Sequence, residues 1–123
     1  MGARQQLDDF LRSTFRSVWS LEVLLAMMQE PGRHWSREAL VETLRASGVI
    51  VERAIGELSA AGLILPESDD AFRYAPATPE LEALAEAARS QYRNAPDAVR
   101  RIIIAGRDGG LSAFAEAFRL RKE

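Results

Sequence analysis

The chain has 123 residues, of which 47% are hydrophobic and 28% charged, a composition typical of one folded domain rather than of a disordered chain. It contains no cysteine and one histidine, which excludes disulfides, cysteine-ligated metals and any site that needs two imidazoles. The formal net charge of −2 hides an uneven distribution. Residues 1–88 carry 8 arginines against 14 acidic residues, whereas residues 89–123 carry 8 basic residues against 4 acidic ones.

The first 16 residues predict a short amphipathic helix, because apolar residues recur there at helical spacing. Charged residues interrupt every apolar run of this segment, so we expect no signal peptide. A second helix with a continuous apolar face follows, and Pro31-Gly32 is expected to end it. That face consists of Leu21, Leu24, Leu25 and Met28.

Two more helices and a hairpin are predicted between residues 35 and 76. Trp35 is expected in a short extended piece, followed by Ser36 as the N-cap of a helix that runs to about Ala46. The next helix is expected at residues 49–61, with Gly62 just past its end because glycine adopts positive φ at little cost. Two β-prone runs on either side of the polar turn segment 66–70 then predict a hairpin.

Three helices are predicted after the hairpin. Thr78-Pro79-Glu80 has the residues of a helix start, Pro96-Asp97 begins another helix, and a glycine-rich joint at residues 106–110 precedes a last one. The apolar side of this last helix has to be covered, and we expect a second copy of the chain to cover it. Its own domain, a partner groove and an anionic membrane surface are the alternatives, and we expect no membrane binding. The residues concerned are Leu111, Phe114 and Phe118.

The most informative stretch runs from Val51 to Ile64 and reads VERAIGELSAAGLI. Apolar residues recur in it at helical spacing, and a small-Gly-Leu-Ile ending leads into the hairpin. It resembles the recognition helix and following strand of bacterial winged-helix repressors of the arsenic-resistance and multiple-antibiotic-resistance kinds. The resemblance extends over roughly residues 17–75, and it implies a mainly α fold with a small β hairpin, that is, a winged helix-turn-helix. We therefore expect an N-terminal helix (1–16), a winged-helix domain (17–76) and a C-terminal helical extension (77–123).

This resemblance implies double-stranded DNA as the partner and transcriptional regulation as the function. In such repressors one face of the recognition helix enters the major groove. By the resemblance, Arg53 is the main base or phosphate contact, and Glu52, Gly56 and Glu57 shape the same helix face. Three further arginines are expected to hold the DNA backbone. They are Arg33, Arg37 and Arg73.

The charges of the same region allow an alternative function. The hairpin carries Glu67, Asp69 and Asp70 against Arg73 alone, and such acidic groups would repel phosphates. The alternative is a protein-interaction module without DNA binding, whose acidic helix face and hairpin dock on a basic protein partner.

No catalytic, metal or cofactor site is expected. His34 has no second histidine, cysteine or evident serine partner and is interpreted as a surface residue. The segment from Gly106 to Gly110 follows no strand and precedes no Gly-Lys-Ser/Thr, so it is not a phosphate loop. We therefore expect that the protein is not an enzyme. From the lack of a signal peptide and from the apolar last helix, we expect it to be cytoplasmic and homodimeric.

Overall fold

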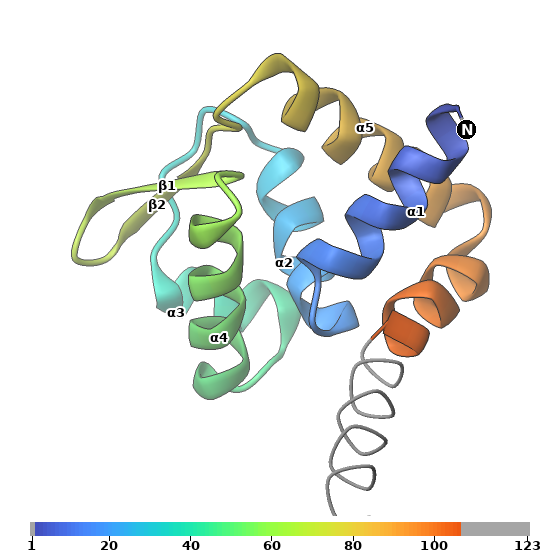
Figure 1. The fold of residues 1–123 in the computed structure, drawn as a ribbon. Coiled ribbons are helices and arrows are strands. Elements are labelled where there is room, and N and C mark those ends of the chain that lie inside the picture. Colours follow the sequence, from blue (N-terminus) through green and yellow to red (C-terminus); the bar gives the residue numbers. More distant parts are fainter. Residues whose placement is uncertain (1, 107–123) are drawn as a thin grey trace, which may run out of the picture.

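The computed structural model describes residues 2–106, and in this part the protein is mainly α, with six helices and one small antiparallel hairpin (Figure 1). The predicted fold class is confirmed to this extent. The helices are α1 (Ala3–Thr14), α2 (Val18–Met28), α3 (Arg37–Leu44), α4 (Gly48–Ala60), α5 (Pro79–Asn94) and a helix at residues 96–106. The strands are β1 (Ile64–Ser68) and β2 (Ala71–Tyr74), which lie between α4 and α5.

Side-chain caps explain where most of these helices begin. Ser17, Ser36, Ser47 and Thr78 each accept a hydrogen bond from a backbone N–H three residues further on, at the starts of α2, α3, α4 and α5. Such caps stabilise a helix by about 1 kcal/mol each. The caps predicted at Ser36 and Thr78 are confirmed.

Two glycine-like backbone conformations separate the elements around α4. Gly62 has φ +78° just after α4, as predicted. Arg45 also has positive φ, 53°, and it ends α3 at Leu44. The helix expected to reach Ala46 is therefore shorter than predicted, because the left-handed conformation of Arg45 turns the chain toward α4.

The hairpin is part of a slightly larger sheet. β1 pairs with β2 in a register that sets Ile64 opposite Tyr74 and Pro66 opposite Phe72. Pro66, expected in the turn, belongs to the strand because β1 is an edge strand, where a missing N–H is tolerated. Trp35 pairs with Phe72 on the other side of β2, through two backbone hydrogen bonds of 2.7 and 2.9 Å.

One hydrophobic core joins all the helices of the described part. α2 is its centre and packs against α4, α3 and β2, with Leu21, Leu24 and Met27 fully buried. α1 and α5 lie side by side across this body (Figure 1). Residues of the segments expected to flank the central domain belong to the same core: Leu7, Phe10, Leu11, Ala85, Ala88, Val99 and Ile103. None of the helices within residues 2–106 has the length and apolarity needed to cross a bilayer.

Candidate nucleic-acid interface

α4 presents one face to the core and the opposite face to solvent. Val51, Ile55 and Leu58 are buried, as their helical spacing predicts. On the opposite face Val49 is 63% exposed and Arg53 is also exposed. The space over Gly56 is open, with no atom within 4 Å of where a side chain would begin. The exposed residues and the open space over Gly56 leave this part of α4 accessible to a large partner.

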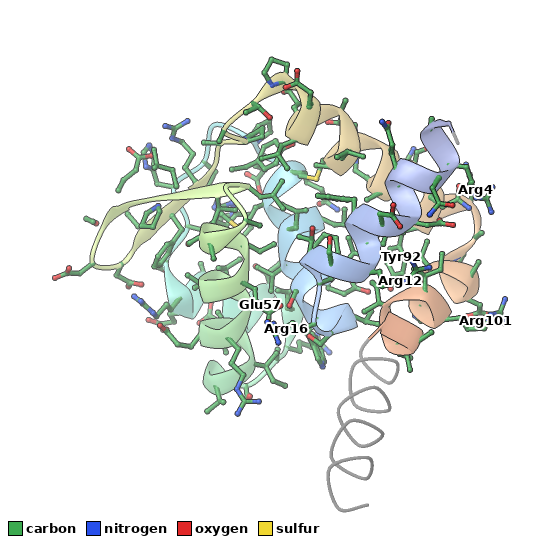
Figure 2. All side chains as sticks on the ribbon, viewed as in Figure 1. Arg4, Arg12, Arg16, Glu57, Tyr92 and Arg101 are labelled. Carbon is green, nitrogen blue, oxygen red and sulfur yellow. The ribbon has the colours of Figure 1, made fainter. Side chains whose placement is uncertain are left out.

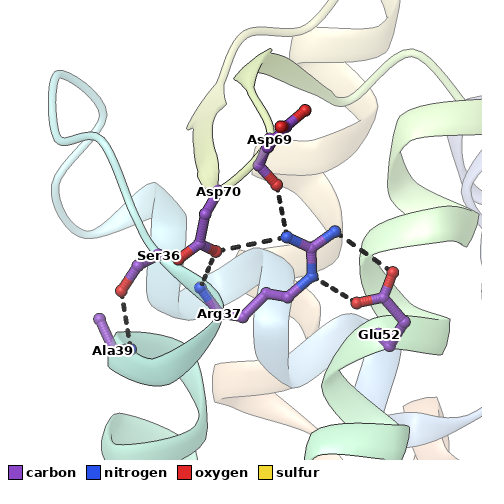
Figure 3. Close-up of polar contacts among 6 residues, drawn as sticks. All are labelled: Ser36, Arg37, Ala39, Glu52, Asp69 and Asp70. Carbon is purple, nitrogen blue, oxygen red and sulfur yellow. Dashed lines mark hydrogen bonds and ion pairs between the residues drawn. The ribbon is translucent and has the colours of Figure 1, made fainter.

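Arg37 joins three elements on the hairpin side of α4 (Figure 3). Its guanidinium donates hydrogen bonds to both carboxylate oxygens of Glu52 on α4, and through Nη1 to the Asp69 carbonyl oxygen at 2.5 Å. Nη1 and the backbone N–H of Arg37 both donate to Oδ1 of Asp70, at 3.3 and 2.9 Å. The hydrogen bond from Arg37 holds the pKa of Glu52 below its ordinary value. Arg37 thus connects the start of α3 with α4 and the hairpin turn.

The other two arginines predicted to hold the DNA backbone also have carboxylate partners. Nε of Arg73 donates to Oε1 of Glu67 at 2.5 Å, and this bond lowers the pKa of Glu67. Arg33 donates to Glu30 at 2.9 Å, and its guanidinium lies 3.7 Å above the ring of Trp35. In the structure all three arginines on this side are engaged within the protein, and their contact with DNA stays a prediction.

A groove opens on the other side of α4, with a volume of about 750 Å³. Arg53 of α4 lines it together with Arg12 at the end of α1, Arg16 in the α1–α2 connection and Trp19 in the first turn of α2. Arg16 and Arg53 have no acidic partner at ion-pair distance within residues 2–106, and Arg12 pairs only with Asp9, at 3.5 Å. This side of α4 therefore offers two cations, Arg16 and Arg53, that no carboxylate of the described part of the chain neutralises.

Glu57 fastens α4 to the start of α2. Its Oε1 accepts a hydrogen bond from the backbone N–H of Arg16 at 3.2 Å and a second one from the hydroxyl of Ser20, which is buried. Figure 2 shows Glu57 and Arg16 together between α4 and the start of α2. The carboxylate predicted to shape the outer face of α4 thus makes its contacts toward α2, and these contacts hold Arg16 near α4.

Arg12, Arg16 and Trp19 were not predicted as site residues from the sequence. The available signal was the spacing of Arg12 and Arg16, which are four residues apart immediately before the Ser17 cap. That spacing alone does not say that the end of α1 lies beside α4.

The remaining predicted residues add little to this interface. Leu111, Phe114 and Phe118, predicted to form a dimer or partner contact, lie outside the described residues. The His34 side chain is exposed, as predicted, with Nδ1 at 3.4 Å from Glu67. In the part of the chain that the structure describes, no group of His, Asp and Glu side chains could hold a metal ion.

Comparison with known proteins adds no assignment. The chain matches no family model, no curated protein and no solved structure. The exposed face of α4 and its two flanks therefore carry what can be inferred about function.

Proposed function

We propose that this protein is a DNA-binding transcriptional regulator of the winged-helix type. The observation that carries the proposal is the exposed face of α4, with open space over Gly56 and with Arg53 lacking a carboxylate partner among residues 2–106. A face of this kind can enter the major groove of B-DNA, which is about 12 Å wide and admits an α-helix.

The order of elements supports the winged-helix assignment. From α2 the chain passes through Trp35 to α3, α4, β1 and β2, and Trp35 pairs with β2. A helix-turn-helix followed by a hairpin, with a short strand before it completing the sheet, is compatible with a winged helix. In helix-turn-helix proteins the second helix of the motif is the one that lies in the major groove, which corresponds here to α4.

The side chains of the α4 face suit contact with base edges. The Arg53 guanidinium can donate two parallel hydrogen bonds to a guanine or bind a phosphate oxygen. The exposed Val49 can contact a thymine methyl group, and Gly56 leaves room for the DNA to come close to the helix backbone. Glu52 lies on the same face with its charge balanced by Arg37.

The test is a titration of the purified protein with a fluorescently labelled duplex of about thirty base pairs, at low and then at physiological salt. We expect binding that weakens steeply with salt, because phosphate neutralisation releases counterions. Arg53→Gln should weaken binding to a preferred sequence by about 1–3 kcal/mol, roughly 5- to 150-fold.

Arg4→Gln is the matched control, because it removes the same charge from the end of α1 that lies away from α4 (Figure 2). It should leave the affinity nearly unchanged. A folded protein that fails to bind the duplex even at low salt would overturn the proposal.

A protein-interaction module is the second candidate, and one observation favours it. On the hairpin side of α4, Arg37 and Arg73 face four acidic residues, Glu52, Glu67, Asp69 and Asp70, so this side keeps an acidic excess despite its ion pairs. The double substitution Asp69→Lys with Asp70→Lys separates the candidates by the sign of its effect. DNA binding should become stronger, whereas capture of a basic partner, with an oligolysine peptide as the probe, should become weaker.

The homodimer predicted from residues 107–123 is part of the same proposal. A symmetric dimer would present two α4 helices to two half-sites about one helical turn apart. Light scattering at several protein concentrations measures the mass, and a monomer at all concentrations would contradict this part of the proposal.

A further inference from the structure

The groove beside α4 is lined on one edge by an arginine corner, which consists of Arg12, Arg16 and Trp19. They come from the last turn of α1, the α1–α2 connection and the first turn of α2. Arg53 lines the same groove from α4. The corner is therefore continuous with the face proposed to enter the major groove.

Tertiary contacts fix the position of this corner relative to α4. The Glu57 carboxylate accepts from the Arg16 N–H and from the Ser20 hydroxyl, so it joins the backbone at Arg16 to the middle of α4. The stem of Arg12 packs against Gly106, where a side chain would collide with it. The guanidinium groups thus extend from a held backbone.

A helix that lies in the major groove has a sugar–phosphate strand on either side. On the hairpin side of α4 the nearby arginines are paired with carboxylates, Arg37 with Glu52 and Asp70, and Arg73 with Glu67. On the corner side Arg16 and Arg53 have no carboxylate partner within residues 2–106, and Arg12 pairs only with Asp9, at 3.5 Å. The phosphates on the corner side would therefore meet unneutralised cations, and those on the hairpin side would not.

We infer that the arginine corner is a second DNA contact, which binds the phosphodiester backbone next to the major groove that α4 occupies. Arg12 and Arg16 donate to phosphate oxygens, for which the guanidinium fork is well shaped. Trp19, 39% exposed, packs its indole against the adjoining deoxyribose. This inference rests on the proposed DNA binding, and it assigns most of the backbone contact to residues outside α3, α4 and the hairpin.

The first experiment measures how the affinity for the thirty-base-pair duplex depends on salt. Each lost phosphate contact reduces the slope of log K against log salt by about 0.9, so Arg12→Gln with Arg16→Gln should reduce it by about 1.8. Glutamine keeps part of each aliphatic stem, including the part of Arg12 that packs on Gly106. Should the double variant not fold, Arg16→Gln alone should reduce the slope by about 0.9.

The matched control is Arg4→Gln with Arg93→Gln, which removes the same charge from exposed positions on α1 and α5 that do not line the groove. Its slope should equal that of the unchanged protein. An unchanged slope in the corner variant, or an equal loss in the control, would overturn the inference.

A second readout uses Trp19 as a reporter of where the DNA lies. Trp35 is buried at 2% exposure, so quenching of the fluorescence by acrylamide reports mainly Trp19. Saturating duplex should protect Trp19, and this protection should be lost in the corner variant. Unchanged quenching with bound duplex, or protection by inorganic phosphate alone, would contradict a DNA-backbone contact.

The two proposals fail in different ways. Absence of duplex binding by the unchanged protein overturns both. Binding that depends on Arg53 but has the same salt slope in the corner variant overturns only the arginine corner.

Discussion

The two flanks of α4 contain similar residues in opposite states. On the hairpin flank Arg37 and Arg73 are bound to carboxylates of α4 and the hairpin. On the corner flank Arg16 and Arg53 have no such partner among residues 2–106, because the neighbouring Glu57 directs its Oε1 to a backbone N–H and a buried hydroxyl. The comparison shows that the number of arginines near an interface says little. What matters is which of them the fold has already neutralised.

The largest effect should come from breaking the contact that builds the corner flank. Glu57→Ala removes the nearer acceptor of the Ser20 hydroxyl and leaves it only Ser17 Oγ, at 3.4 Å; Ser20 is 1% exposed. An unsatisfied buried hydroxyl costs about 1–3 kcal/mol, and the free energy of unfolding should fall by that amount in urea denaturation. Ser20→Ala should lower the free energy of unfolding less, because it removes the hydroxyl itself and so leaves no buried hydroxyl without a partner. If the losses of unfolding free energy of the two single variants simply added up in the double variant, Glu57 and Ser20 would not stabilise the fold through their mutual hydrogen bond.

Removing the central cation of the hairpin flank should have the next largest effect. Arg37→Gln leaves Glu52 and Asp70 unbalanced beside the α4 face, so the affinity for the duplex should fall by about two- to fivefold. If Arg37 acts by neutralising these acids, adding Glu52→Gln should restore most of the affinity. A direct phosphate contact by Arg37 predicts no such rescue, and a fluorescence titration of the unchanged protein and these two variants separates the two roles.

The hairpin flank should also be the acid-sensitive one. Hydrogen bonds from Arg37 and Arg73 lower the pKa values of Glu52 and Glu67 from their ordinary value of 4.5. Their ionised forms therefore stabilise the fold above that pH, and this contribution disappears as the pH falls through the lowered values. In urea unfolding across this range, the variant with Glu52→Gln and Glu67→Gln should lose less stability than the unchanged protein. An equal loss would show that neither carboxylate is held as described.

The smallest effect is expected from removing a whole ion pair of the hairpin flank. Arg73→Gln with Glu67→Gln leaves the net charge unchanged and deletes two charges that already neutralise each other. The duplex affinity should change by less than about twofold, in contrast to Arg53→Gln. A larger loss would return Arg73 to the role of backbone contact that the sequence predicts.

Much of the fold was predictable because its signals are local. The buried face of α4 follows from the spacing of Val51, Ile55 and Leu58, and the starts of α3 and α5 follow from Ser36 and Thr78. The early end of α3 was not predicted, since no residue pattern at this position indicates the left-handed conformation of Arg45.

The candidate site was predictable only in part. The exposed residues of α4 follow from subtracting its buried ones, and Val49, Arg53 and Gly56 are exposed as this predicts. The pairings of Arg37 with Asp70 and of Ser20 with Glu57 join residues 33 and 37 positions apart. No local pattern specifies such pairs, because they depend on how the helices pack.

The sequence by itself determined the order of helices and hairpin, the caps and the apolar faces, because these follow from backbone preferences and from the period of the side chains. The tertiary structure decided which charged groups meet. Packing α4 on α2 and α3 set Glu52 beside Arg37, Glu57 beside Ser20, and Arg53 in a groove with Arg12 and Arg16. A charge is neutralised by its neighbours in space, and for these residues the neighbours lie on other elements of the fold.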